Sequence, residues 1–199
     1  MKTKDKILGR LRQGVRELFD MPNLSKLRPI AYPNPVAQFI QKATTTAGAH
    51  LIELQEGADL NQVVHDAYPQ AQVFASNLPG IDVQLNPDTV AEARELTAVD
   101  VGIIRGYIGV AENACIWIPQ TMKEKAICFA SENLVVLLQR QDIVSNMHQA
   151  YALIEGSDEY FRDYKFGTFI SGPSKTADIE SALVYGAQAA RSLTIILTD

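Results

Sequence analysis

A short run of polar and small residues, Ser171–Thr176, has the composition of a small-anion binding loop. An apolar run ends just before it, and helical spacing over Asp178–Tyr185 predicts a helix just after it. The unpaired amides of such a helix, together with Lys175 and the hydroxyl groups, would hold a carboxylate or a phosphate. Gly172 would allow close approach of the backbone, and Pro173 would stiffen the turn.

The same residues also fit a purely structural turn. Ser174 or Thr176 would cap the predicted helix, and the charges of Asp178 and Glu180 would complement its dipole. In the binding interpretation, Asp178 orients the loop or accepts a hydrogen bond from a ligand hydroxyl. Glu180 stabilises the loop without contacting the ligand. Spacing alone does not separate these interpretations.

The loop does not have the spacing of a nucleotide-binding P-loop. Gly167 and Gly172 match the first interval of that motif, but Pro173-Ser174 separates the second glycine from Lys175. The intervening residues also form a predicted strand. Nucleoside triphosphate hydrolysis is therefore not expected.

A carboxylate interrupts the second segment of interest, Gly109–Ile116. Glu112 and Asn113 lie at the tip of a predicted hairpin, flanked by apolar residues. A carboxylate in such surroundings is costly unless it is paired or used, which makes Glu112 a candidate nucleophile or base. The alternative is a solvated turn residue.

Cysteine and histidine are too sparse for a metal or iron–sulfur centre. The chain has two cysteines and three histidines, none at ligand spacing: Cys115, Cys128, His50, His65 and His148. We therefore expect no metal, no cofactor bound by this chain, and free thiols in the reducing cytoplasm.

Hydrophobic periodicity predicts an α/β domain. The expected helices are 36–47, 59–67, 88–95, 142–154 and 178–185, and the expected strands are 50–54, 72–75, 107–111, 115–118, 134–138, 166–171 and 193–198. Residues 99–104 fit either a strand or a short buried helix. Alternating helices and continuous apolar strands predict a Rossmann-like, mostly parallel sheet with helices on both faces. Ligands of such sheets bind beyond the carboxyl ends of the strands, where we expect Ser171 to lie.

The predicted domain is preceded by an arm. Residues 1–34 comprise an amphipathic helix and a proline-rich linker, and residues 35–199 form a single α/β domain. The net charge of −5 gives no reason to expect nucleic-acid binding, and no apolar run is long enough to span a membrane. We expect the arm to dock on the domain or on a neighbouring subunit, so a homo-oligomer is one possibility.

Two motifs together resemble the LUD-domain family, the lactate-utilisation group typified by LutC. Ser171–Glu180 resembles its G-P-S-x-T-A-D-I-E signature, and Gly109–Asn113 resembles its G-I-A-E-T-G segment. The resemblance implies a fold similar to the NagB/RpiA/CoA-transferase group. It also implies a role in oxidising L-lactate to pyruvate beside partner proteins that carry iron–sulfur clusters. The ligand would be a small anion of the lactate, CoA or phosphate type.

The sequence departs from the family pattern at two histidine positions. Asn133 aligns where the family often has a histidine before a central strand, and Gln188 aligns with the histidine of Gly-x-His-Gly-Pro. Without these histidines the obvious acid–base groups are absent. Two alternatives therefore stay open: a CoA- or sugar-phosphate-handling transferase or isomerase that uses Glu112, and a non-catalytic ligand-binding regulatory module.

Overall fold

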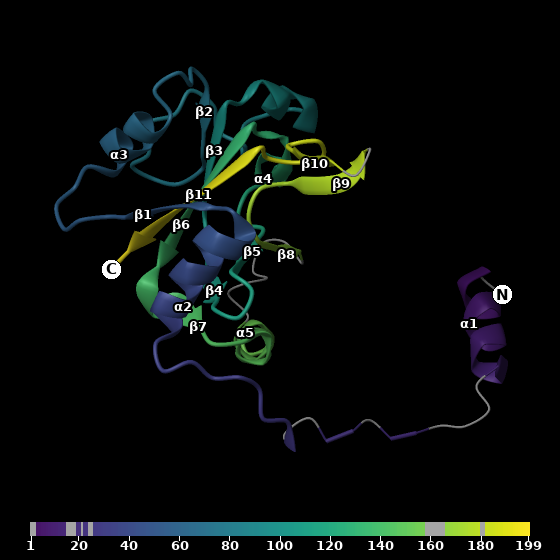
Figure 1. Ribbon diagram of the computed structural model, residues 1–199. Helices are drawn as coiled ribbons and strands as arrows, with labels where there is room; N and C mark the ends of the chain where they lie inside the picture. The colour runs from purple at the N-terminus through teal and green to yellow at the C-terminus, as the bar shows by residue number, and fades with distance from the viewer. Residues whose placement is uncertain (1–2, 15–18, 21, 24–25, 158–165, 180–181) are drawn as a thin grey trace.

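The computed structural model describes residues 3–14, 19–20, 22–23, 26–157, 166–179 and 182–199. Five parallel strands form its central sheet in the order β1-β11-β6-β3-β2 (Figure 1). Their bounds are β1 His50–Glu53, β11 Ser192–Thr198, β6 Asn133–Gln139, β3 Val101–Arg105 and β2 Phe74–Ala75. The two central strands, β6 and β11, read as continuous aliphatic runs because both of their faces are covered.

Helices cover both faces of this sheet, as expected. Helix α3 (Leu60–Ala67) packs Val64 on one face, against Phe74, Ile103 and neighbouring side chains. Helices α2 (Pro35–Lys42) and α4 (Ile127–Ala130) lie on the other, where Phe39 and Ile127 enter the main core. The predicted Rossmann-like α/β architecture is confirmed.

A second sheet, which the sequence did not predict as a separate layer, packs against the same core. Its order is β7-β4-β5-β8, with bounds Ile143–Val144, Ile108–Val110, Cys115–Pro119 and Gly167–Ile170. Strand β5 divides its side chains between two cores, with Ile116 facing the parallel sheet and Trp117 facing helix α5 (Met147–Glu155). Gly106 permits the close crossing between the sheets, because a Cβ there would lie 2.4 Å from Ile116 Cγ2.

Several expected elements change type or length. Residues 99–104 form strand β3, and the predicted hairpin at 107–118 is confirmed as β4 and β5. The helix expected over 88–95 is replaced by a turn and the short 3-10 helix η3 (Ala93–Ala98), because the Glu92–Glu95 capping box starts the helix late. Helix α5 begins five residues later than expected, since Ile143–Val144 pair with β4 and Asn146 caps the helix.

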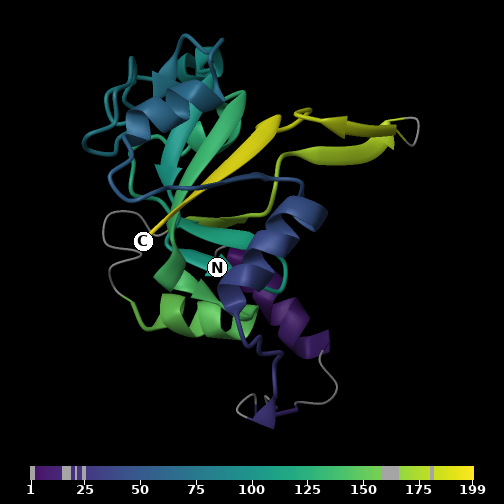
Figure 2. The same ribbon diagram turned by 60° about the vertical axis from the view of Figure 1, so that its left-hand side comes forward.

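The largest error concerns the helix expected over 178–185. These residues belong to an antiparallel hairpin formed by β9 (Lys175–Ile179) and β10 (Ala182–Tyr185). In β9 the apolar residues Ala177 and Ile179 alternate with the polar Thr176 and Asp178, which is the period of a strand, and β10 is a short continuous apolar run. Figures 1 and 2 show this hairpin projecting beyond both sheets.

The amino-terminal helix α1 (Thr3–Gly14) is present, and none of its residues is buried. It lies apart from the domain at the end of the linker in Figure 1. Among the described helices, none has both the length and the apolar content needed to cross a bilayer.

Candidate functional site

The two sequence motifs meet in the folded chain. The Ser171 hydroxyl donates a 2.9 Å hydrogen bond to the main-chain carbonyl of Asn113, so the loop after β8 touches the β4–β5 hairpin tip. The side chain of Asn113 is used locally, because its Oδ1 accepts the amide of Cys115 at 3.1 Å. The contact joins segments that are 58 residues apart along the chain.

The expected helix N-terminus is not present beside this loop. Because Lys175–Ile179 form strand β9, their backbone pairs with β10, with Lys175 opposite Tyr185 and Thr176 opposite Val184. An anion therefore finds no helix dipole here. The prediction that helix amides hold the ligand is wrong.

The loop itself is fixed on two sides. Gly172 has φ +71°, and a Cβ there would lie 2.2 Å from the Ala47 carbonyl oxygen, so glycine alone fits. The Ser174 amide donates to the Ala190 carbonyl at 2.9 Å, and its carbonyl accepts from the Gly186 amide at 3.0 Å. The main chain is thereby pre-formed from Gly172 to Ser174.

Lys175 supplies the positive charge of the loop. Its ammonium donates to the carbonyls of Ala47 and, at 3.5 Å, Thr46, at the end of the π-helix η2 (Ala43–Ala47) that continues α2. Free carbonyls at a helix end favour a cation. Because an ammonium has three donor hydrogens, one stays available for a ligand.

A cavity of about 390 Å³ adjoins this loop, within the usual range for small-molecule sites. Its wall includes one basic group, three polar side chains and a larger apolar set: Lys175, Ser171, Ser174, Gln188, Cys128, Phe129, Leu134, Phe169, Ile170, Gly172, Pro173, Ala189, Ala190 and Leu193. Leu134 and Leu193 lie at the start of β6 and β11. The cavity is therefore at the amino end of the parallel sheet, and the expected position beyond the carboxyl ends is wrong.

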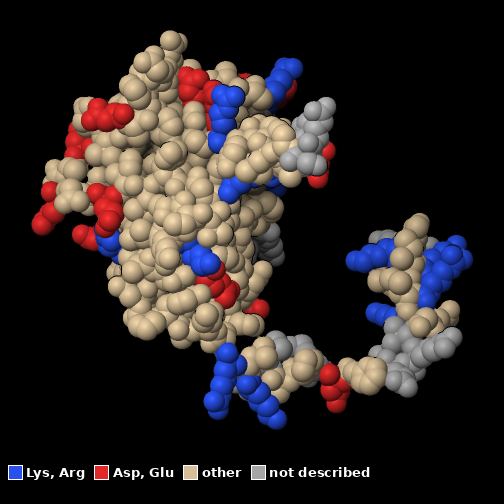
Figure 3. Space-filling model, in the orientation of Figure 1, with Lys and Arg blue, Asp and Glu red and all other residues tan. Residues whose placement is uncertain are grey.

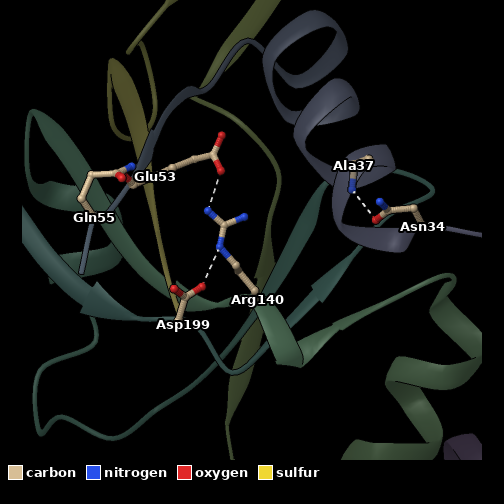
Figure 4. A network of polar contacts seen from close by, with 6 residues as sticks. All are labelled: Asn34, Ala37, Glu53, Gln55, Arg140 and Asp199. Carbon is tan, nitrogen blue, oxygen red and sulfur yellow. Dashed lines mark hydrogen bonds and ion pairs between the residues drawn. The ribbon is translucent and has the colours of Figure 1, made fainter.

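The carboxyl ends of the strands carry an ion-pair network instead (Figure 4). Arg140 follows β6, and its guanidinium forms ion pairs with two carboxylates. Glu53, at the end of β1, lies 2.5 Å away, and Asp199, which follows β11, lies 3.0 Å away. These contacts raise the pKa of Arg140, with the hydrogen bond to Glu53 as the main cause. The network ties three strands together at this edge.

The other predicted site residues that the structure describes do not line the cavity. Glu112 accepts the Met147 amide at 2.8 Å and so stabilises the first turn of α5. Thr176 Oγ1 accepts the amide of Asp178 at 3.3 Å on the hairpin, where Asp178 is exposed. Asn133 donates to the Asp100 carbonyl at 2.9 Å and accepts from Ser192 at 2.7 Å, adjacent to Leu134 of the wall. Glu180 lies outside the described residues.

Gln188 and Cys128 are wall residues that sequence reasoning missed. The signal for Gln188 was the family resemblance, which aligns this residue with the histidine of Gly-x-His-Gly-Pro. Burial raises the pKa of Cys128 to about 12, and burial likewise raises the pKa of Cys115 to about 12. Both thiols are therefore protonated at neutral pH and poorly suited to nucleophilic attack.

The described residues contain no group of three or more His, Cys, Asp or Glu side chains arranged to hold a metal ion. The three histidines are exposed and scattered over β1, α3 and α5. The geometry that the chain does offer is a small, partly apolar cavity with one ammonium group, two hydroxyls and one amide. Such a set can orient a small monoanion that has an apolar part.

Comparison with known proteins gives a family and a fold. The LUD domain model matches residues 36–198. A crystal structure of a DUF162 family protein from Deinococcus radiodurans superposes with a TM-score of 0.65 at 13% identity, covering 86% of this chain and all of the other. A search among curated proteins gives no match. Since the family model spans most of its length, the chain belongs to the LUD-domain family.

Proposed function

We propose that this protein is a LutC-like cytoplasmic component of L-lactate utilisation that binds a small anion in the cavity beside Lys175. The family supports a role related to lactate utilisation. The observation that carries the finer proposal is that the signature loop Ser171–Lys175 forms one wall of a cavity and includes Lys175 in that wall. Lactate or pyruvate, each a carboxylate with a short apolar part, matches that wall in charge and polarity.

In this proposal the chain binds and positions its ligand and carries no redox centre of its own. The electrons released when L-lactate becomes pyruvate would pass to iron–sulfur partner proteins, which hold the clusters that this chain does not ligate. Ser174 and Gln188 would donate hydrogen bonds to the ligand, and Lys175 would neutralise its charge.

Growth on L-lactate tests the role in the cell. Deletion of the gene is expected to abolish or slow growth on L-lactate as sole carbon source, while growth on pyruvate stays normal. Wild-type protein should restore growth, and Lys175→Met, produced at the same level, should not. Normal growth of the deletion strain on L-lactate would overturn the proposal.

A second candidate is a non-catalytic regulatory module that uses the same cavity. It is favoured by the wall chemistry, because the two neutral thiols and the exposed histidines leave no obvious acid–base group at the ligand. A protein that binds the ligand tightly, while lactate oxidation by cell extracts is unaffected by its removal, would support this candidate over the first.

A further inference from the structure

The amino-terminal arm and the domain carry opposite charges. Residues 1–34 contain eight Lys and Arg against three Asp and Glu, a net charge of +5. Residues 35–199 contain ten against twenty, a net charge of −10. In Figure 3 basic side chains dominate α1, whereas acidic side chains gather along the opposite, left-hand margin of the domain.

Helix α1 presents an apolar stripe that stays exposed among the residues that the structure describes. Ile7, Leu8 and Leu11 share one side at helical spacing, and 56%, 38% and 62% of their surfaces are exposed. Arg10 and Arg12 flank this stripe on either side. An isolated helix of this length is marginal in water, so a docking surface is needed to hold it.

The acidic margin of the domain has a matching surface. Between Lys42 and Arg94 the sequence contains seven acidic residues and no Lys or Arg. This segment includes α3 and supplies Leu60, Leu78, Pro79 and Ile81 to a groove of about 230 Å³, whose apolar walls also include Leu137. A groove of this kind accepts an apolar side chain from an amphipathic helix.

Hydrogen bonds hold two acidic residues close to this groove. The amide of Asn61 donates to Asp59 Oδ1 at 2.9 Å, and Asn61 Oδ1 accepts the amide of Asp82 at 2.9 Å. Asp59 and Asp82 are therefore both hydrogen-bonded to Asn61, and they are sequence neighbours of the wall residues Leu60 and Ile81. The one basic wall residue, Arg105, stacks on Tyr107 at 4.8 Å.

We propose that α1 of one molecule docks in this acidic groove of a second copy of the chain, with the reverse contact completing a two-fold dimer. The apolar stripe would enter the groove, and Arg10 and Arg12 would meet the two acids close to it. The 20 residues between α1 and α2 reach at most about 66 Å, enough to cross to a partner. The structure favours a second copy as the occupant, because α1 lies away from the groove of its own domain (Figures 1 and 3).

Charge exchange between copies tests the proposal. Sedimentation of the full chain should show a monomer–dimer equilibrium that weakens in high salt. The arm variant R10E/R12E and the groove variant D82K should each weaken it by at least about tenfold. Mixing the two variants should restore a dimer, because each arm then meets a groove of opposite charge. The matched control Glu155→Lys, an exposed acid on α5, should dimerise like the wild type.

Three outcomes would overturn the proposal. The first is a full-length chain that stays monomeric at all concentrations, whether α1 is free or docked on its own domain. The second is a dimer that R10E/R12E leaves intact. The third is a monomeric chain whose α1 binds vesicles of anionic lipid, which would make a membrane surface the partner. Because the substitutions lie on exposed positions, circular dichroism should confirm that each variant is folded.

Discussion

Gly172 determines the path of the candidate binding loop. Its left-handed backbone and the nearby carbonyl of Ala47 both exclude a side chain. The Lys175 ammonium donates a hydrogen bond to the same carbonyl. The end of η2 therefore fixes both the backbone of the turn and the position of the ammonium. The loop is therefore built against α2 and η2, which follow directly from the arm.

Replacement of Gly172 should destabilise the fold through backbone strain and through a clash with Ala47, and a control variant can separate the two effects. Gly172→Ala is expected to lower the free energy of unfolding by about 3 kcal/mol, the sum of backbone strain and a clash with Ala47. Gly57→Ala also places alanine at positive φ (+77°), but meets no atom within 4 Å, and should cost only about 1 kcal/mol. Urea denaturation measures both. Equal losses in the two variants would contradict the close approach at Gly172.

Asp100 should make stability depend on acidity. The amides of Val73 and Gln72 donate to its carboxylate at 2.9 and 2.7 Å and lower its pKa. Because the pKa of Asp100 is lower in the folded chain than in the unfolded chain, its ionised carboxylate stabilises the fold at any pH above the unfolded-state pKa of about 3.9. This stabilisation is lost as the pH falls through the pKa that Asp100 has in the folded chain.

Asp100→Asn should accordingly reduce the loss of unfolding free energy between pH 7 and pH 3. Because Asp100 is only half-buried, the expected difference from wild type is about 0.5 to 1 kcal/mol. Asp66→Asn removes an exposed acid that accepts a hydrogen bond from a side chain only, and should follow the wild type closely. An identical pH dependence in D100N and the wild type would refute this role of Asp100.

Among the elements, the cap of α2 is the clearest case in which sequence chemistry decides a boundary. Asn34 Oδ1 accepts the amide of Ala37 at 3.0 Å (Figure 4), and Pro35 occupies the first turn. Asn34→Ala should lower the free energy of unfolding by about 1 kcal/mol, whereas Asn34→Asp, which keeps the acceptor, should not. Urea denaturation of the two variants would refute the cap if both lost the same amount.

Elements with a single strong pattern could be predicted from the sequence, and elements that depend on distant partners could not. The aliphatic runs of β6 and β11, the Asp59 cap of α3 and the β4–β5 hairpin follow from local residues. The β9–β10 hairpin was predicted wrongly as a helix, because acidic residues after Lys175 resemble a helix start and the hairpin pairing is not visible in the local sequence. The cavity could not be predicted, since it requires the pairing of β8 with β5 and the approach of Ala47.

In the whole molecule, the site lies where three parts of the chain converge on one end of the parallel sheet. The end of η2 supplies carbonyls for Lys175, the loop after β8 supplies hydroxyls, and the segment before β11 supplies Gln188. The opposite end is held by Arg140, Glu53 and Asp199 (Figure 4). The candidate site therefore lies at the amino end of the sheet, and the ion-pair network lies at its carboxyl end.

The central claim is that Lys175 holds a small carboxylate in the cavity beside the signature loop. Calorimetric titration of the full-length protein with L-lactate, pyruvate and inorganic phosphate tests it most directly. At least one carboxylate should bind, and Lys175→Met should weaken it at least about tenfold. Lys123→Met, which removes a lysine bound to the Val90 carbonyl at 3.0 Å outside the cavity, should leave the affinity unchanged. Carboxylate binding that Lys175→Met does not weaken, or no binding of any of the three anions, would contradict the account.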